Sequence, residues 1–224
     1  MKNKIFNLLM IDKSQLKNCN DQQNPNVPQA EEVKTSISMD FFDKPTIYIS
    51  DTIQEGDEEL FEACIKSMEH SVDENDESFY TPIKELTIEI NSYGGSLSAT
   101  LGIIAQIEEM QKRGVVITSI VKGKAMSGAC MIQLMANRRL ARKFSQLMYH
   151  APLLAPSTVD GYLSVADLRA LLKTIEYDWN IMKQMLKDKT KLTDKQINKI
   201  YKDCIDFTMS VDAALEYGFI DEIL

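Results

Sequence analysis

Ser127 is the residue whose surroundings most favour nucleophilic chemistry. It lies in residues 123–130, GKAMSGAC, between two apolar runs. The run at 115–121 is short and β-branched and predicts a buried strand, whereas the run at 129–136 predicts a buried helix. Free N–H groups and the positive end of the helix dipole meet at such a junction, so a serine nucleophile can stand there beside an oxyanion site. The position also suits a serine that only caps the helix.

Two further features follow predicted strand ends. Gly94 follows an apolar run and precedes a helix, and His150 ends another apolar run. Because parallel strands present their carboxyl ends to one edge of a sheet, we group Gly94, His150 and Ser127 at that edge. The chain has only one other histidine, His70, which stands beside an acidic segment. His150 is therefore the better candidate for a base that activates a serine, although a histidine can also simply end a strand.

The elements that must position these residues alternate along the chain. Hydrophobic periodicity and β-branched runs predict strands at 46–49, 86–90, 115–121, 144–150 and 219–220. Helices are predicted from about residue 55, at 97–112, 129–136, 164–189, 193–202 and 210–217. Two of these helices begin with capping boxes, SVAD from Ser164 and TDKQ from Thr193. The alternation predicts an α/β fold with a mostly parallel sheet and right-handed crossover helices.

Composition excludes several classes of function. The 224 residues are 44% hydrophobic and 26% charged, with a net charge of −8, which argues against nucleic acid and anionic membranes as partners. No run approaches the roughly 20 apolar residues of a membrane span. The four cysteines are scattered without a CxxC pair, so we expect reduced thiols in a cytoplasmic protein. The sequence predicts no metal site and no cofactor.

Residues 1–44 differ from the rest of the chain. The stretch 18–29 is rich in amides and proline and has no periodicity, so we predict a flexible N-terminal arm or loop over 1–44. No clear small-residue cleavage site follows the short apolar run near the N-terminus, which argues against a signal peptide. The folded domain is predicted to span 45–224.

Four segments, in order, resemble the Clp protease proteolytic subunit (ClpP) family of serine peptidases. They are INSYGGS at 90–96, GKAMS at 123–127, MYHAP at 148–152, and DFTMS at 206–210 followed by AALEYGFID at 213–221. The resemblance covers roughly residues 45–224. It implies a ClpP/crotonase-like fold in which the helix 164–189 is the long handle element. The interval of 23 residues from serine to histidine is closest to that of phage-type ClpP-like proteases.

By this resemblance, Ser127 is the nucleophile and His150 the general base of a Ser-His-Asp triad. Asp206 would be the third member, which holds the imidazole tautomer and stabilises the imidazolium. Asp203 is the fallback, three residues earlier. The implied reaction is endopeptidase cleavage of unfolded polypeptides through an acyl-enzyme intermediate.

The resemblance also assigns the backbone N–H groups of Gly94 and Gly128 to the oxyanion hole. The sequence departs from the family beside both. Tyr93 replaces the usual proline before the two glycines, and Gly128-Ala129 follows the serine where the family usually has Met-Gly. The first departure changes the turn at Gly94, and the second changes the side chain beside the oxyanion amide.

Assembly is likewise implied by resemblance. Members of the family form homo-oligomers, heptameric rings that are often stacked in pairs around an enclosed chamber. Such subunits often work with an ATP-dependent (AAA+) unfoldase, which would bind the ATP because this chain has no GxxxxGK[ST] loop.

Other readings of the sequence stay open. One is a related serine protease of phage capsid maturation, and another is an inactive ClpP-like subunit that only completes a ring. A crotonase-type acyl-CoA enzyme would share the fold, but a serine, a histidine and an aspartate at the family positions argue against it. A Ser–Lys dyad would recruit Lys122 or Lys124 and would leave the His150 segment unexplained.

Overall fold

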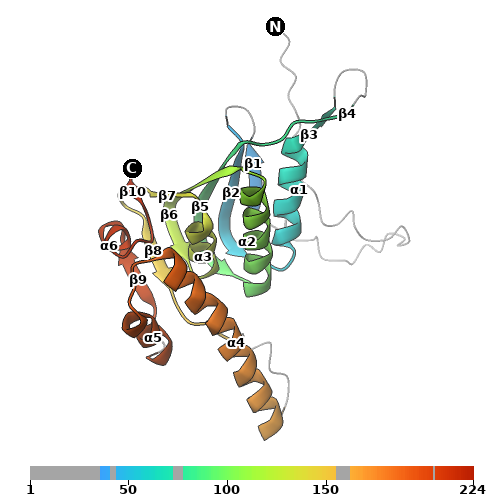
Figure 1. Cartoon of the computed structure of the whole chain (residues 1–224). Coiled ribbons are helices and arrows are strands. Elements are labelled where there is room, and N and C mark those ends of the chain that lie inside the picture. Colours follow the sequence, from blue (N-terminus) through green and yellow to red (C-terminus); the bar gives the residue numbers. More distant parts are fainter. Residues whose placement is uncertain (1–35, 41–43, 73–77, 155–161, 204) are drawn as a thin grey trace, which may run out of the picture. The chain divides into compact units, whose positions relative to one another are not determined.

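The computed structural model describes residues 36–40, 44–72, 78–154, 162–203 and 205–224. The predicted arm falls mostly outside these residues. Within them, an eight-stranded sheet forms the centre of the fold (Figure 1). The chain separates into two units, 1–34 and 35–224, and everything described here belongs to the second.

The sheet is mostly parallel, with an antiparallel pair at each of two of its ends. Its main path runs β1 (Ile37–Asp40), β2 (Thr46–Ile53), β5 (Glu85–Gly95), β6 (Val116–Met126), β7 (Arg138–Ala141) and β10 (Glu222–Ile223). A branch adds β8 (Gln146–Tyr149) beside the end of β6, and β9 (Phe207–Ser210) beside β8. Only the β1–β2 and β8–β9 pairs within this sheet are antiparallel. The predicted mostly parallel α/β fold is confirmed.

Six helices lie among the described residues. They are α1 (Asp57–Glu69), α2 (Leu97–Lys112), α3 (Gly128–Met135), α4 (Val165–Lys189), α5 (Asp194–Lys202) and α6 (Val211–Glu216). A separate hairpin joins β3 (His70–Val72) to β4 (Ser78–Tyr80). Helices α1, α2 and α3 lie over one face of the sheet (Figure 1).

The hydrophobic core lies between this face of the sheet and the helices that cover it. Alternate residues of the central strands point into it, among them Leu86, Ile88 and Ile90 of β5, all at most 1% exposed. The other face of β5 and β6 is half-buried or exposed and carries polar side chains, as expected from the period of two in a strand. Helix α3 is buried over its whole length, which explains why it is apolar on every side.

Several boundaries differ from the predicted ones. The last strand lies at 222–223 instead of 219–220, because Phe219 and Ile220 are buried at the end of α6. The short strands β7 and β9 were not predicted, since four residues carry too little periodicity. Strand β1 adds to the sheet a segment upstream of residue 45. Strands β5 and β6 run on to Gly95 and Met126, so Gly94 lies within the end of a strand.

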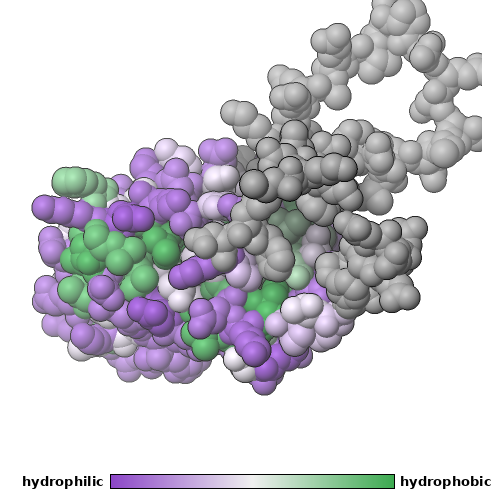
Figure 2. Space-filling view, turned by 90° about the horizontal axis from the view of Figure 1, so that it is seen from above, coloured by the Kyte–Doolittle hydropathy of each residue, from purple (hydrophilic) through white to green (hydrophobic). Residues whose placement is uncertain are grey.

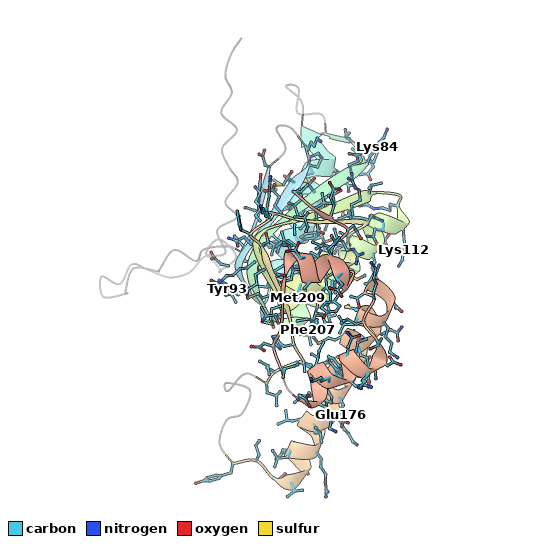
Figure 3. The ribbon with its side chains drawn as sticks, turned by 90° about the vertical axis from the view of Figure 1, so that its left-hand side faces the viewer. Lys84, Tyr93, Lys112, Glu176, Phe207 and Met209 are labelled. Carbon is cyan, nitrogen blue, oxygen red and sulfur yellow. The ribbon has the colours of Figure 1, made fainter. Side chains whose placement is uncertain are left out.

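Helix α4 begins at the predicted capping box, with the Ser164 and Asp167 side chains bonding each other's backbone N–H groups. Its C-terminal half packs on the domain through Trp179, Met182 and Leu186. Its first turns are exposed, and Glu176 lies on the part that extends away from the sheet (Figure 3). Seen from above, the surface mixes small hydrophobic patches with hydrophilic residues (Figure 2). No helix among the described residues is long and apolar enough to cross a bilayer.

The C-terminal segment is held by Arg139. Its guanidinium donates to both carboxylate oxygens of Asp221, at 2.6 and 3.2 Å, and to the carbonyls of Lys189 and Gly218. Partial burial alone would raise the pKa of Asp221, but the hydrogen bonds from Arg139 outweigh it and lower that pKa. One charged group therefore joins β7 to the ends of α4 and α6.

Asp221→Asn is expected to lower the free energy of unfolding by about 1 kcal/mol at pH 7, a value reduced by solvent screening. A carboxylate whose pKa is depressed on folding stabilises the protein above its unfolded pKa of about 3.9, and this contribution is lost as the pH falls through the lower folded value. The difference between variant and wild type should therefore shrink at acid pH. Urea unfolding at pH 7 and near pH 3 measures it, with Glu222→Gln as control. An equal loss at both pH values would contradict this explanation.

Candidate active site

Ser127 has an unusual backbone at the junction of β6 and α3. Its φ of 53° and ψ of −123° lie in a region that non-glycine residues rarely occupy. Its N–H donates to the Met148 carbonyl at 2.8 Å, and its side chain forms no cap hydrogen bond with α3. Ser127 therefore occupies the N-cap position of α3, but its hydroxyl does not cap the helix. Strain of this kind gathers at functional sites, where the surrounding structure holds it in place.

His150 is brought to Ser127 by strand pairing. Strand β8 pairs in parallel with the end of β6, with Met148 opposite Met126, so His150 follows β8 where Ser127 follows β6. The half-buried imidazole has its Nδ1 2.5 Å from the Ala151 carbonyl oxygen. Because a carbonyl only accepts, Nδ1 carries the hydrogen in this contact and Nε2 of the neutral ring keeps a lone pair. This is the tautomer that a general base for serine requires.

Asp206 is placed near His150 by the antiparallel pair β8–β9. Tyr149 is opposite Phe207, so the next residues in register are His150 and Asp206. The Asp206 side chain is exposed, and no hydrogen bond joins it to the imidazole in this structure. Asp203, the alternative, ends α5 and is also exposed. The strand register favours Asp206.

Gly94 lies against the residues on either side of Ser127 and against the Ser127 Cβ. A Cβ added to Gly94 would lie 2.4 Å from the Met126 carbonyl oxygen, 2.8 Å from the Gly128 nitrogen and 2.8 Å from the Ser127 Cβ. Its φ of 84° also favours glycine. The two glycines predicted for an oxyanion hole therefore meet beside the serine. Gly128 is the first residue of α3, so its N–H has no acceptor within the helix.

The Gly94 N–H, however, is not free in this structure. It donates to the Ser92 hydroxyl at 3.1 Å, and this fully buried hydroxyl donates to the Asp51 carbonyl at 2.7 Å. Asp51 has a φ of 56°, and the pairing of β2 with β5 shifts register between Asp51 and Thr52. Ser92 thus holds the Gly94 peptide in one orientation. A role for Ser92 was not predicted, because nothing in its sequence context distinguishes it from a structural strand residue.

Thr100 explains why a glycine follows the serine. A Cβ on Gly128 would lie 2.3 Å from the Oγ1 of Thr100, a fully buried residue of α2. That hydroxyl donates to the Ser96 carbonyl at 2.7 Å, so its position is fixed. The threonine therefore occupies the space that a side chain at residue 128 would need. This contact was also not predicted, since it joins two helices that are separate in sequence.

Lys122 and Lys124 have other partners than Ser127. Lys122 forms an ion pair with Glu89, and the Lys124 ammonium lies 3.1 Å from the Tyr93 hydroxyl and 4.5 Å from its ring centre. These partners are on strand β5, and the Lys122 ammonium also lies 5.8 Å from the ring centre of Tyr48 on β2. A Ser–Lys dyad has no support in this arrangement.

Behind the site, two buried residues fix β8. Tyr149 is fully buried and donates from its hydroxyl to the Met182 carbonyl of α4 at 3.1 Å. Burial raises the pKa of the Tyr149 phenol and that of the Cys130 thiol well above their usual values, so both stay neutral. The strand that carries His150 is therefore tied directly to the handle helix.

Serine hydrolases typically have a strained serine between a strand and a helix. A histidine at the end of the adjacent strand and backbone amides beside the serine, as found here, complete such a site. Residues 29–224 match the family model described as Clp protease. The chain therefore belongs to the Clp protease family and is a serine-type endopeptidase of that family.

Curated relatives agree with this assignment. The chain is 31% identical over 173 residues to an ATP-dependent Clp protease proteolytic subunit 1 from Gloeobacter violaceus, covering 76% of this chain and 80% of the relative. It is 31% identical over 146 residues to the proteolytic subunit from Porphyromonas gingivalis, covering 64% and 61%. A proteolytic subunit 1 from Chlamydia muridarum is 28% identical over 148 residues, covering 64% and 72%.

Proposed function

We propose that Ser127 cleaves peptide bonds by nucleophilic catalysis. The Ser127 hydroxyl attacks the scissile carbonyl while His150 Nε2 takes its proton, and the imidazolium then protonates the leaving amine. Water hydrolyses the resulting acyl-enzyme with His150 again as base. One observation carries this proposal. The Ser127 hydroxyl forms no cap hydrogen bond with α3 and stands on a strained backbone, beside the strand that His150 directly follows.

Asp206 completes the proposed triad after a local change. In this structure the His150 Nδ1–H donates to the Ala151 carbonyl, which holds the ring in the required tautomer but adds no negative charge. A turn of the ring toward Asp206, its neighbour in the strand register, would replace that acceptor with a carboxylate. The carboxylate would then stabilise the imidazolium formed during the reaction.

The proposed oxyanion hole also needs a change at one donor. Gly128 offers its N–H at the start of α3, whereas the Gly94 N–H is bonded to Ser92. For both groups to stabilise the developing oxyanion, the Gly94 peptide must turn from the Ser92 hydroxyl toward the substrate. In this proposal, the arrangement described here is the resting state of the enzyme before substrate binds.

The family assignment, which makes this chain a serine-type endopeptidase, does not support the inactive ring subunit that the sequence left open. In our proposal, the contact of Asp206 with His150 and the release of the Gly94 N–H from Ser92 occur only during catalysis. Catalytic turnover by the purified chain, lost in Ser127→Ala, tests the assignment of Ser127. The alternative of a capsid-maturation protease shares the triad and differs in its assembly.

We further propose that the chain assembles with copies of itself. The exposed first half of α4 carries apolar residues at helical spacing, namely Val165, Leu168 and Leu172 at 63, 54 and 52% exposure. Such a stripe is costly in water and suits a second copy of the helix. Following the family resemblance, the assembly would be a heptameric ring, stacked in pairs through this helix. The mass of the protein in solution tests it, and a 25 kDa monomer would count against it.

A partner and a cellular location are also proposed. The relatives are named ATP-dependent, so we propose an AAA+ unfoldase that delivers unfolded polypeptides to this chain. Scattered cysteines, of which Cys64 and Cys130 are free thiols here, support a cytoplasmic location.

His150→Ala is expected to lower peptide turnover by on the order of 10³-fold or more, because the serine then lacks its base. Hydrolysis of a fluorogenic peptide measures this loss. His70→Ala is the matched control, since His70 is exposed and its ring contacts the Lys66 carbonyl and the Tyr80 ring. Turnover by the His150 variant within a factor of ten of wild type would remove His150 from the mechanism.

A further inference from the structure

An ammonium group without a carboxylate partner lies beside the candidate site. Lys124 stands three residues before Ser127 on β6, with its Nζ 3.1 Å from the Tyr93 hydroxyl and 4.5 Å from the ring centre. Among the described residues, no carboxylate forms an ion pair with Lys124, whereas Lys122 on the same strand pairs with Glu89. Lys124 differs from other unpaired lysines in its place, three residues from Ser127 and against an aromatic ring.

Tyr93 and Lys124 belong to strands β5 and β6 and not to loops. Tyr93 directly precedes Gly94, where an added Cβ would lie 2.8 Å from the Ser127 Cβ. The Tyr93 side chain is 56% exposed at the margin of the sheet (Figure 3). The Lys124 N–H donates to the Asn91 side chain at 3.0 Å, and that amide fills the space beside Gly123, where a Cβ would lie 2.5 Å from its oxygen. Both side chains therefore start from fixed backbone positions.

Contact with the ring and the hydroxyl orders the lysine side chain before any substrate arrives. A cation over an aromatic face with a hydrogen bond to the same residue loses less conformational freedom on meeting a ligand than a free lysine does. The ring keeps the ammonium at the surface, where an anion can reach it. A site of this kind favours a carboxylate over a neutral amide of the same shape.

We propose that Tyr93 and Lys124 form a subsite for a carboxylate of the substrate. This proposal rests on the proposed peptidase function and names one feature of its substrates. Three residues of extended chain span about 10 Å, so the ammonium lies within reach of substrate residues about two or three positions from the scissile bond. The ligand chemistry is a carboxylate, either of an Asp or Glu side chain or of a peptide C-terminus.

Binding to the non-cleaving Ser127→Ala protein tests the subsite independently of catalysis. Fluorescence anisotropy compares peptide pairs that differ only by Asp against Asn at each of the three positions on either side of the cleavage site. A second pair differs only by a free against an amidated C-terminus and separates the two sources of carboxylate. We expect about threefold to tenfold tighter binding of the acidic member at one position, decreasing as salt is added.

Variants in the same Ser127→Ala background assign that preference to the pair. Lys124→Met should bring the ratio of the two dissociation constants to about one, Lys124→Arg should keep it, and Tyr93→Leu should weaken it. Lys122→Met is the matched control, because that lysine is already paired and should leave the ratio unchanged. Equal binding of acidic and neutral peptides, or a preference that survives Lys124→Met, would overturn the proposal. If the wild-type protein cleaved no peptide, that result would count against the proposed peptidase function and not against the subsite.

Discussion

Replacing Ser127 with alanine is expected to reduce peptide cleavage by at least on the order of 10⁴-fold, because removal of a nucleophile leaves only binding and oxyanion stabilisation. Replacing it with glycine should cause the same loss of activity but a different change in stability. The backbone at Ser127 has φ 53° and ψ −123°, which glycine adopts without a steric penalty and alanine does not.

The strain of such a backbone is about 1–3 kcal/mol, and the greater freedom of glycine in the unfolded chain offsets part of the relief. We therefore expect Ser127→Gly to be about 1 kcal/mol more stable than Ser127→Ala in chemical unfolding. Equal stability of the two variants would show that the position is not strained. An alanine variant that retains activity would show that the nucleophile lies elsewhere.

Gly94→Ala is expected to impair both stability and activity. The added methyl would meet backbone atoms of Met126 and Gly128 as well as the Ser127 Cβ, all at 2.8 Å or less. Backbone atoms cannot yield as a flexible side chain does, so β5 must move away from the serine. We expect a loss of about 2 kcal/mol or more in unfolding free energy and of on the order of 10²-fold in turnover.

Gly114→Ala separates the effect of crowding from that of backbone conformation. Gly114 has φ 88°, close to the 84° of Gly94, but an added Cβ there meets nothing within 4 Å. Its substitution should cost only about 1–2 kcal/mol of left-handed strain and leave turnover unchanged. If both alanine variants lost the same stability and kept their activity, close packing of Gly94 against Ser127 would not matter for the site.

The sequence predicted the central elements of this fold because they are long or strongly patterned. Helix α4 starts at its capping box, and the β-branched run at 115–121 lies in β6. Strand β9 escaped prediction because FTMS has no clear alternation and gains its pairing only from β8. The wrong position of the last strand has a similar cause: Phe219 and Ile220 are apolar because they are buried in the core.

For the site, sequence and resemblance indicated which residues to examine but not how their hydrogen bonds are arranged. That the Gly94 N–H faces Ser92 depends on the register shift between β2 and β5, which no local pattern encodes. The close contact between Gly128 and Thr100 likewise arises from helix packing. The strained backbone of Ser127 donates its N–H to the carbonyl of Met148, which lies 21 residues further along the chain.

The central claim is that Ser127 is a nucleophile activated by His150, and covalent labelling tests it most directly. The protein is incubated with a fluorophosphonate, and the modified residue is located by peptide mass spectrometry in the wild type, Ser127→Ala and His150→Ala. We predict one adduct on Ser127 in the wild type, none in Ser127→Ala, and labelling slowed by orders of magnitude in His150→Ala. An adduct that persists in Ser127→Ala, or equally fast labelling of the His150 variant, would contradict this account.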